Sequence, residues 1–185
     1  MPRIAPLDYD EMPPDARAAH DRHLQTARIT NMKRTLLHSV PAFDALMTWY
    51  DLRGAVKPFL GDRLTTLFAH AVSSETDCLI CSTFFRRILM ESGEDPDALE
   101  MDDREAAVVA FGRALAATPH RAPDAVYDRV AVYFGDEQMV ALTAFGALMV
   151  ATNVINNALG VRLDDYLQPF RRPALAPSEG VGTHG

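Results

Sequence analysis

The chain has 185 residues, of which 48% are hydrophobic and 23% charged, and its formal net charge is −7. This composition predicts one soluble globular domain that is long enough to bury a sizeable core. An acidic chain without a basic run is not expected to bind a nucleic-acid backbone. Residues 1–6 lack the apolar core of a signal peptide, so we expect the protein in the cytoplasm. There a disulfide is more often transient or catalytic than structural.

The sequence predicts helices throughout, because no segment shows the sustained period-two alternation of a strand. The fold class is therefore all-α, with a single helical domain at residues 14–170. Residues 1–13 are rich in proline and acids and are expected to run as an extended arm over a neighbour or the surface. Residues 171–185 are rich in proline, glycine and serine and are predicted to be a disordered tail.

Within the domain, helix boundaries are predicted from apolar spacing at i, i+3 and i+4 and from stop signals such as proline and glycine. In chain order, the predicted helices cover about 14–26, 32–38, 41 to the Pro58–Gly61 break, 64–72, 78–92, 102–117, 124–134 and 139–161.

The last predicted helix, 139–161, carries no formal charge, and its length alone would allow a membrane span. Its uninterrupted apolar part is too short for that interpretation, so we expect a helix buried in the core or at a subunit interface. Polar residues interrupt it, and the asparagines need partners: hydrogen bonds between helices or, as a second option, a substrate. These residues are Thr143, Thr152, Asn153, Asn156 and Asn157.

Cys78 and Cys81 are the only cysteines, and they follow the polar run 73–77 at a predicted helix start. Free N–H groups and the positive end of the helix dipole favour a thiolate there. The two-residue spacing lets the sulfurs close a disulfide by exchange. The alternative is a pair of buried cysteines that act as small hydrophobic residues. Apolar neighbours such as Leu79 and Ile80 support that alternative, because burial raises a thiol pKa.

The sequence around the pair resembles the AhpD-like alkylhydroperoxidase and carboxymuconolactone decarboxylase superfamily. The resemblance covers roughly residues 40–165. Its most specific piece is Cys-x-x-Cys after an Ala-Val-Ser turn. The similar segments are Leu67-Phe68-Ala69-His70-Ala71-Val72-Ser73-Ser74, Cys78-Leu79-Ile80-Cys81, residues 103–115 and Val154-Ile155-Asn156-Asn157-Ala158-Leu159-Gly160-Val161.

The resemblance implies an all-helical fold that assembles as trimers or as dimers of trimers. In the peroxidase branch it implies a dithiol that reduces hydroperoxides and becomes a disulfide. Cys81 would attack the peroxide oxygen, and Cys78 would resolve the sulfenic acid. The position at a helix start points the other way, because Cys78 lies nearer the positive end of the dipole. The sequence leaves the identity of the nucleophile open.

Two positions depart from the peroxidase branch, which carries a glutamate twelve residues before the first cysteine and a histidine four residues after the second. Thr66 and Phe85 occupy those positions here. Neither side chain can relay a proton as a carboxylate or an imidazole would. The decarboxylase branch matches less well, because it does not depend on such a cysteine pair.

His70 is the candidate replacement base, since it shares a helix face with Thr66 and an imidazole titrates near neutral pH. The alternative is a histidine at the edge of the core, bonded to a carbonyl. Arg86 and Arg87 could stabilise a thiolate or a substrate carboxylate, or form a solvated face or a subunit salt bridge. The other histidines form no metal-ligand pattern, so we expect neither a metal nor another cofactor.

The sequence therefore predicts a thiol–disulfide oxidoreductase with Cys78, Cys81 and His70 at its site. The expected substrate is a hydroperoxide or an oxidised thiol, with an unidentified thiol as electron donor. The apolar last helix and the proline-rich arm also predict a homo-oligomer. Two other functions stay open: a non-catalytic scaffold or redox-sensing binding protein, and a decarboxylase-type enzyme that uses His70 and an arginine.

Overall fold

The computed structural model describes residues 2–172 and contains no strand in that range, so the all-α prediction is confirmed. The predicted tail lies outside the described residues from 173 onward. The elements are η1 (Tyr9–Glu11), α1 (Pro14–Leu24), α2 (Asn31–Leu36), α3 (Val40–Met47), α4 (Trp49–Glu75), α5 (Leu79–Glu91), α6 (Asp103–Ala116), α7 (Asp124–Ala131), α8 (Asp136–Leu159) and η2 (Asp165–Phe170).

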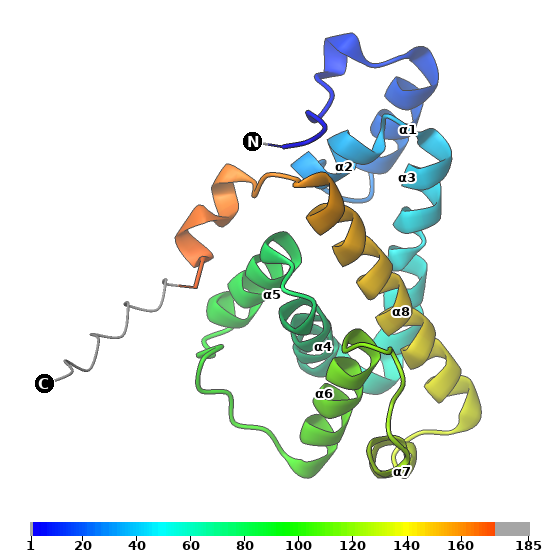
Figure 1. Ribbon diagram of the computed structural model, residues 1–185, viewed down its shortest axis with the longest axis vertical. Coiled ribbons are helices and arrows are strands. Elements are labelled where there is room, and N and C mark those ends of the chain that lie inside the picture. Colours follow the sequence, from blue (N-terminus) through cyan, green and yellow to red (C-terminus); the bar gives the residue numbers. More distant parts are fainter. Residues whose placement is uncertain (1, 173–185) are drawn as a thin grey trace, which may run out of the picture.

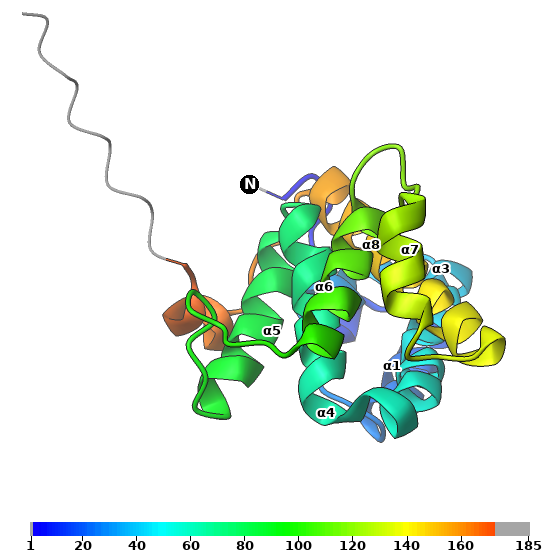
Figure 2. The ribbon, with the colours of Figure 1, turned by 90° about the horizontal axis from the view of Figure 1, so that it is seen from below.

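Helix α4 is the centre of the domain and packs against α5, α6 and α8 (Figures 1 and 2). Phe68 of α4 is fully buried and stacks on Phe145 of α8, with ring centroids 5.8 Å apart. The ring of Phe68 fits between two glycines, Gly112 of α6 and Gly146 of α8. A Cβ atom at Gly112 would lie 2.9 Å from that ring. The glycines therefore allow three helices to approach one another around one aromatic side chain.

The predicted break at Pro58 and Gly61 is a kink inside α4. Gly61 has φ 78° and ψ 170°, outside the helical region, and helical geometry resumes after it. A positive φ of this kind is readily adopted only by glycine. A further break, which was not predicted, lies earlier, at Thr48, which separates α3 from α4. The single helix predicted from Pro41 is therefore wrong, and the chain forms two helices there.

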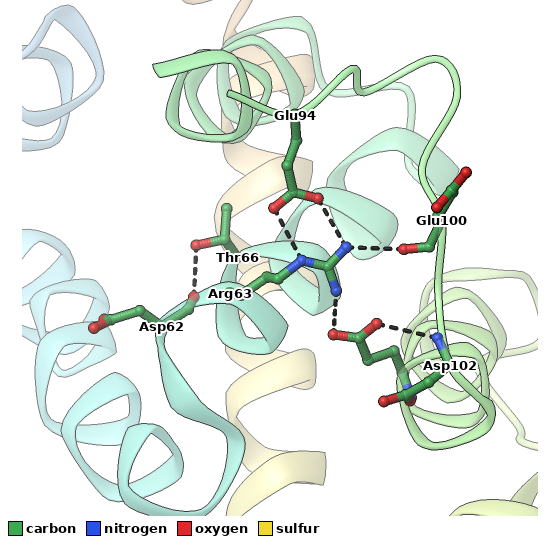
Figure 3. A network of polar contacts seen from close by, with 7 residues as sticks. Asp62, Arg63, Thr66, Glu94, Glu100 and Asp102 are labelled. Carbon is green, nitrogen blue, oxygen red and sulfur yellow. Dashed lines mark hydrogen bonds and ion pairs between the residues drawn. The ribbon is translucent and has the colours of Figure 1, made fainter. Parts of the chain in front are cut away.

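Arg63, just after the kink, ties α4 to the acidic connection and to α6 (Figure 3). Its guanidinium donates to both carboxylate oxygens of Glu94, at 3.0 and 2.8 Å, and to the Glu100 carbonyl at 2.9 Å. It also pairs with Glu105, whose carboxylate completes the capping box of Asp102 at the start of α6. The pairing raises the pKa of Arg63, chiefly through its hydrogen bonds to the two carboxylates.

The N-terminal segment is not an extended arm throughout. Residues 9–11 form η1, and Met12 is buried in a second small core with α1, α2 and α3. Arg3 donates from its backbone to the Leu159 carbonyl and from its side chain to the Ala158 carbonyl, at 2.9 and 2.8 Å. The segment thus crosses the C-terminal end of α8, where Figure 1 also shows α2.

Helix α8 is the one helix of residues 2–172 that is long and apolar enough to cross a membrane. It packs along α4 and α6, and its buried face carries Met139, Leu142, Phe145 and Met149. Its place between other helices matches the predicted core helix.

Replacement of Gly112 by alanine should lower the free energy of unfolding by about 1–2 kcal/mol, because the new methyl group overlaps the buried Phe68 ring. The matched control is Gly54→Ala in α4. No atom lies within 4 Å of its added Cβ, so that change should stabilise the protein by about 0.5–1 kcal/mol. Denaturant unfolding measures both values. Equal stability of Gly112→Ala and the wild type would contradict the packing argument.

Candidate functional site

Cys78 lies in the tight turn that joins α4 to α5, directly before the first helical residue of α5. Asp77 has a positive φ of 49°, which reverses the chain, and the Cys78 N–H donates to the Ser73 carbonyl at 3.0 Å. Cys81 follows one turn later on the buried face of α5. The prediction of a Cys-x-x-Cys pair at a helix start is confirmed, and both thiols are reduced.

Two asparagines of α8 hold this turn in place. Asn153 donates to the Thr76 hydroxyl at 2.8 Å, and Asn157 donates to the Thr76 carbonyl at 2.9 Å. The expectation of hydrogen bonds between helices is confirmed for both residues. The position of the cysteine turn is therefore fixed by the central apolar helix rather than by the turn sequence alone.

Asn156 lies between those asparagines on α8 and contacts the sulfurs themselves. Its side-chain N–H donates toward Cys81 Sγ at 3.4 Å and toward Cys78 Sγ at 3.7 Å. Asn156 is 2% exposed, so water competes little for these contacts. An amide donor stabilises a thiolate in preference to a thiol. Asn156 is thus part of the site, whereas the sequence analysis expected it to bond another helix or, as a second option, a substrate.

The two thiols differ in their electrostatics. The pKa of Cys78 is lowered to about 7, first by a hydrogen bond from the Cys81 thiol and then by the nearby N–H groups of Cys81, Ile80 and Asn156, against the effect of burial. The Cys78 side chain, at the N-cap position of α5, accepts no capping hydrogen bond from the backbone N–H groups of that helix. The pKa of Cys81 is raised, first because its thiol donates a hydrogen bond to the Cys78 thiolate and then because it is buried. The pair therefore shares one proton near neutral pH.

The sulfur with the lower pKa, that of Cys78, is also the less accessible one. Cys78 is fully buried, whereas Cys81 is 9% exposed and lines an inner cavity of about 110 Å³. Apolar and aromatic side chains make up most of the wall: Met32, Leu46, Met47, Trp49, Ile80, Phe84, Phe85, Met149 and Leu167. Residues 163–167, which include part of η2, close the cavity from the C-terminal side. The inner cavity can hold a small apolar molecule against Cys81.

Lys33 and Asp164 are the charged residues of this wall, and the sequence analysis predicted neither of them. Lys33 is the cation of the two. It is 5% exposed and donates to the Arg28 carbonyl at 2.6 Å and to the Tyr50 hydroxyl at 2.9 Å. Burial lowers the pKa of Lys33 to about 8, and the charge of Asp164 partly offsets that effect. A lysine in the short helix α2 gives no sequence signal of burial, since lysine is seldom buried.

Neither position that departs from the peroxidase branch carries a proton relay. The Thr66 hydroxyl donates to the Asp62 carbonyl of its own helix at 2.9 Å (Figure 3). Phe85 lies in the walls of the inner cavity and of a neighbouring outer cavity, which Thr66 also lines.

His70 is partly buried and lines neither of these two cavities. Within residues 2–172 it makes no hydrogen bond to either sulfur. Burial and then the charge of Arg86 lower the pKa of His70 to about 4, against the effect of Asp97. Arg86 itself is paired with Asp97 at 2.6 Å. His70 therefore has the surroundings of a neutral histidine at the edge of the core.

Ionisation of the pair can be followed by the ultraviolet absorbance of its thiolate. The first proton should leave with a midpoint near pH 7, so the thiolate is lost as the pH falls below that value. Asn156→Leu should move the midpoint up by about one pH unit, because an amide donor to the thiolate is lost. Ala151→Ser is the control, because Ala151 is an exposed residue of the same helix and lines neither cavity. An unchanged midpoint in Asn156→Leu would contradict this role.

Solved structures with the same architecture exist, although no protein-family model matches the sequence and no curated protein matches it significantly. The debrominase Bmp8 has a TM-score of 0.72 and 18% identity, over 90% of this chain and 95% of that chain. Its cysteine-to-alanine variant in complex with 2,3,4-tribromopyrrole has a TM-score of 0.72 and 17% identity, over 90% and 94% of the two chains.

A third similar structure is an alkylhydroperoxidase AhpD core, an uncharacterised peroxidase-related protein from Ralstonia eutropha JMP134. Its TM-score is 0.72 and its identity 20%, over 94% of this chain and 98% of that chain. At these identities the likeness is one of fold, and it extends over nearly the whole domain. The chain therefore has the AhpD-like helical fold, with Cys78 and Cys81 as its Cys-x-x-Cys pair.

Proposed function

We propose that the protein is a thiol–disulfide oxidoreductase that works through Cys78 and Cys81, with a cytoplasmic thiol as the electron donor. The observation that carries the proposal is a pair of free cysteines of which one member, Cys81, lines a largely apolar cavity. A pair of merely structural cysteines would need neither a lowered thiol pKa nor a cavity beside it.

Cys81 is the nucleophile in this proposal. The charge of the pair lies mainly on Cys78, yet that sulfur is fully buried and lines neither cavity. Accessibility to the substrate determines which cysteine is the nucleophile, because a substrate in the inner cavity can contact only Cys81. Transfer of the shared proton from Cys81 to Cys78 gives the attacking thiolate, and Asn156 donates toward both sulfurs in either arrangement.

With a hydroperoxide as substrate, the Cys81 thiolate attacks the outer oxygen and the O–O bond breaks. The leaving alkoxide takes a proton and departs as an alcohol, and Cys81 becomes a sulfenic acid. The Cys78 thiol, which received the shared proton, then attacks the sulfenic sulfur: the S–O bond breaks, the disulfide forms, and the hydroxyl group leaves with that proton as water. A dithiol donor reduces the disulfide by exchange and completes the cycle.

The proton for the leaving alkoxide comes from Lys33, through the Tyr50 hydroxyl or directly. Lys33 is a charged donor in the wall that holds Cys81, and its lowered pKa makes it an acid suited to neutral pH. The Tyr50 hydroxyl accepts from Lys33 and keeps its own proton free to donate. This pair takes the place of the relay absent at Thr66 and Phe85.

A second candidate is reductive removal of a halogen from a small aromatic ring. The aromatic side chains Trp49, Phe84 and Phe85 in the wall favour a flat substrate. One protein of the same fold is a debrominase. The halogen would leave as halide, the ring carbon would gain a proton, and the two thiols would become a disulfide. Bromide release from 2,3,4-tribromopyrrole, measured beside hydroperoxide consumption, separates the two reactions.

The chain is also proposed to self-associate, as a trimer or a dimer of trimers. Exposed apolar side chains on α8 support this, since Val140 is 68% and Val154 is 55% exposed. Light scattering at micromolar concentration should give a mass of at least three chains. A monomer would contradict the proposal.

Replacement of Cys81 by serine should abolish hydroperoxide consumption in the presence of a dithiol reductant, because the sulfur in the cavity is lost. Cys78→Ser should reduce one equivalent of hydroperoxide and then stop or slow, since no neighbouring thiol resolves the sulfenic acid. Peroxide loss over time measures both variants. Turnover of Cys81→Ser at the wild-type rate would refute the oxidoreductase proposal and favour a scaffold.

Lys33→Met should slow hydroperoxide consumption at neutral pH by about a hundredfold, the scale of general acid catalysis. The wild-type rate should rise through about pH 7 as the pair ionises and fall through about pH 8 as Lys33 loses its proton. The alkaline fall should vanish in Lys33→Met. Lys57→Met is the control, because Lys57 pairs with Asp62 outside both cavities. A Lys33→Met profile like that of the wild type would exclude Lys33 as the acid.

A further inference from the structure

The outer cavity, next to the inner one, has a volume of about 350 Å³ and a strongly one-sided charge. None of the residues that line it is acidic, although the whole chain has a net charge of −7. Its lining instead includes four cationic side chains from four parts of the chain: Arg28, Lys33, Arg53 and Arg87. The volume lies at the lower end of the range of small-molecule sites.

These cations are only weakly neutralised by carboxylates of the described residues. Arg53 lies 3.9 Å from Asp62, which is already paired with Lys57 at 2.8 Å. The buried Nε of Arg87 lies 3.5 Å from a carboxylate oxygen of the exposed Glu91, and within residues 2–172 it makes no hydrogen bond. An unsatisfied buried donor favours a ligand that can accept from it.

The remaining two cations are held by groups that leave their charge in place. The hydrogen-bond partners of Lys33 are a carbonyl and a hydroxyl oxygen. The carboxylate whose charge acts on Lys33 is that of Asp164, which lines the inner cavity and not the outer one. The guanidinium of Arg28 lies over the Tyr166 ring, 4.5 Å from its centroid. The local excess of positive charge thus points into a space that a small anion could fill.

The outer and inner cavities share one wall. Trp49, Tyr50 and Lys33 line both, together with Thr30, Phe84, Phe85 and Tyr166. A molecule that occupies both cavities would have its polar end among the cations and its apolar end beside Cys81. The two cavities together therefore fit one amphipathic ligand better than two separate ligands.

We propose that the outer cavity binds the carboxylate of a small organic acid whose apolar end enters the inner cavity toward Cys81. The chemistry at Cys81 rests on the proposed function, whereas the binding of the acid does not. Arginine forks match the two oxygens of a carboxylate, and an aliphatic or aromatic chain matches the wall around Cys81. The expected substrates are thus hydroperoxides, or halogenated rings, that also carry a carboxylate.

Trp49 reports on this site, since it is the only tryptophan of the chain and lines both cavities. The experiment titrates the Cys81→Ser protein with hexanoate and with hexanamide, its neutral counterpart, and follows tryptophan fluorescence. Hexanoate should bind at least about tenfold more tightly than hexanamide, and added salt should weaken its binding. Equal binding of the two, or binding of neither, would overturn the proposal without any variant of the cationic residues.

Arg87→Met should weaken hexanoate binding about five- to tenfold and leave hexanamide binding unchanged, because one cation is lost from the site. Arg121→Met, in an exposed loop that lines neither cavity, is the charge-matched control. Equal hexanoate affinity in Arg87→Met and the control would also overturn the proposal. Failure of the proposed function would appear separately, as peroxide turnover that survives Cys81→Ser while hexanoate still binds.

Discussion

The attachment of the cysteine turn to α8 is the constraint on which the rest of the site depends. Thr76 is uncharged, yet two α8 asparagines donate hydrogen bonds to it: Asn153 to its hydroxyl at 2.8 Å and Asn157 to its carbonyl at 2.9 Å. Asn156, between them, contacts both sulfurs. Buried amides are costly unless they are hydrogen-bonded, and two of the three, Asn153 and Asn156, are buried. The turn in this position therefore stabilises α8. The packing of α4 and α8 around Phe68 fixes the distance between the helices.

The second organising feature is a charge inside an apolar wall. Lys33 is nearly buried, and burial of a lone ammonium group is unfavourable, as its lowered pKa records. A chain selected only for stability would place an apolar residue there. Helix α2 carries this charge, and Leu46 and Met47 of α3 line the same cavity. The small core around Met12 and Phe43 is therefore the support of a wall of the proposed site as well as a packing unit.

The sequence predicted the helical class, most helices and the start of α5, because apolar spacing and stop signals are local. It also predicted the cysteine pair and the loss of the relay at Thr66 and Phe85. It failed where the outcome depends on packing. Thr48 carries no helix-breaking signal, yet α3 ends there. Lys33 lies in a short helix without any sequence signal of burial, yet it is 5% exposed. For His70 the sequence left two interpretations open, and its place beside Arg86 and Asp97 favours the histidine at the edge of the core. No periodicity shows which face of a helix meets a cavity.

The most direct test of the central claim is to find which sulfur a substrate oxidises first. The Cys78→Ser protein is treated with one equivalent of hydroperoxide in the presence of a sulfenic-acid trap, and the labelled peptide is identified by mass spectrometry. Cys81→Ser is treated in parallel. The cavity geometry predicts a label on Cys81 in the first protein and little label on Cys78 in the second. A strong label on Cys78, or none on Cys81, would contradict the account.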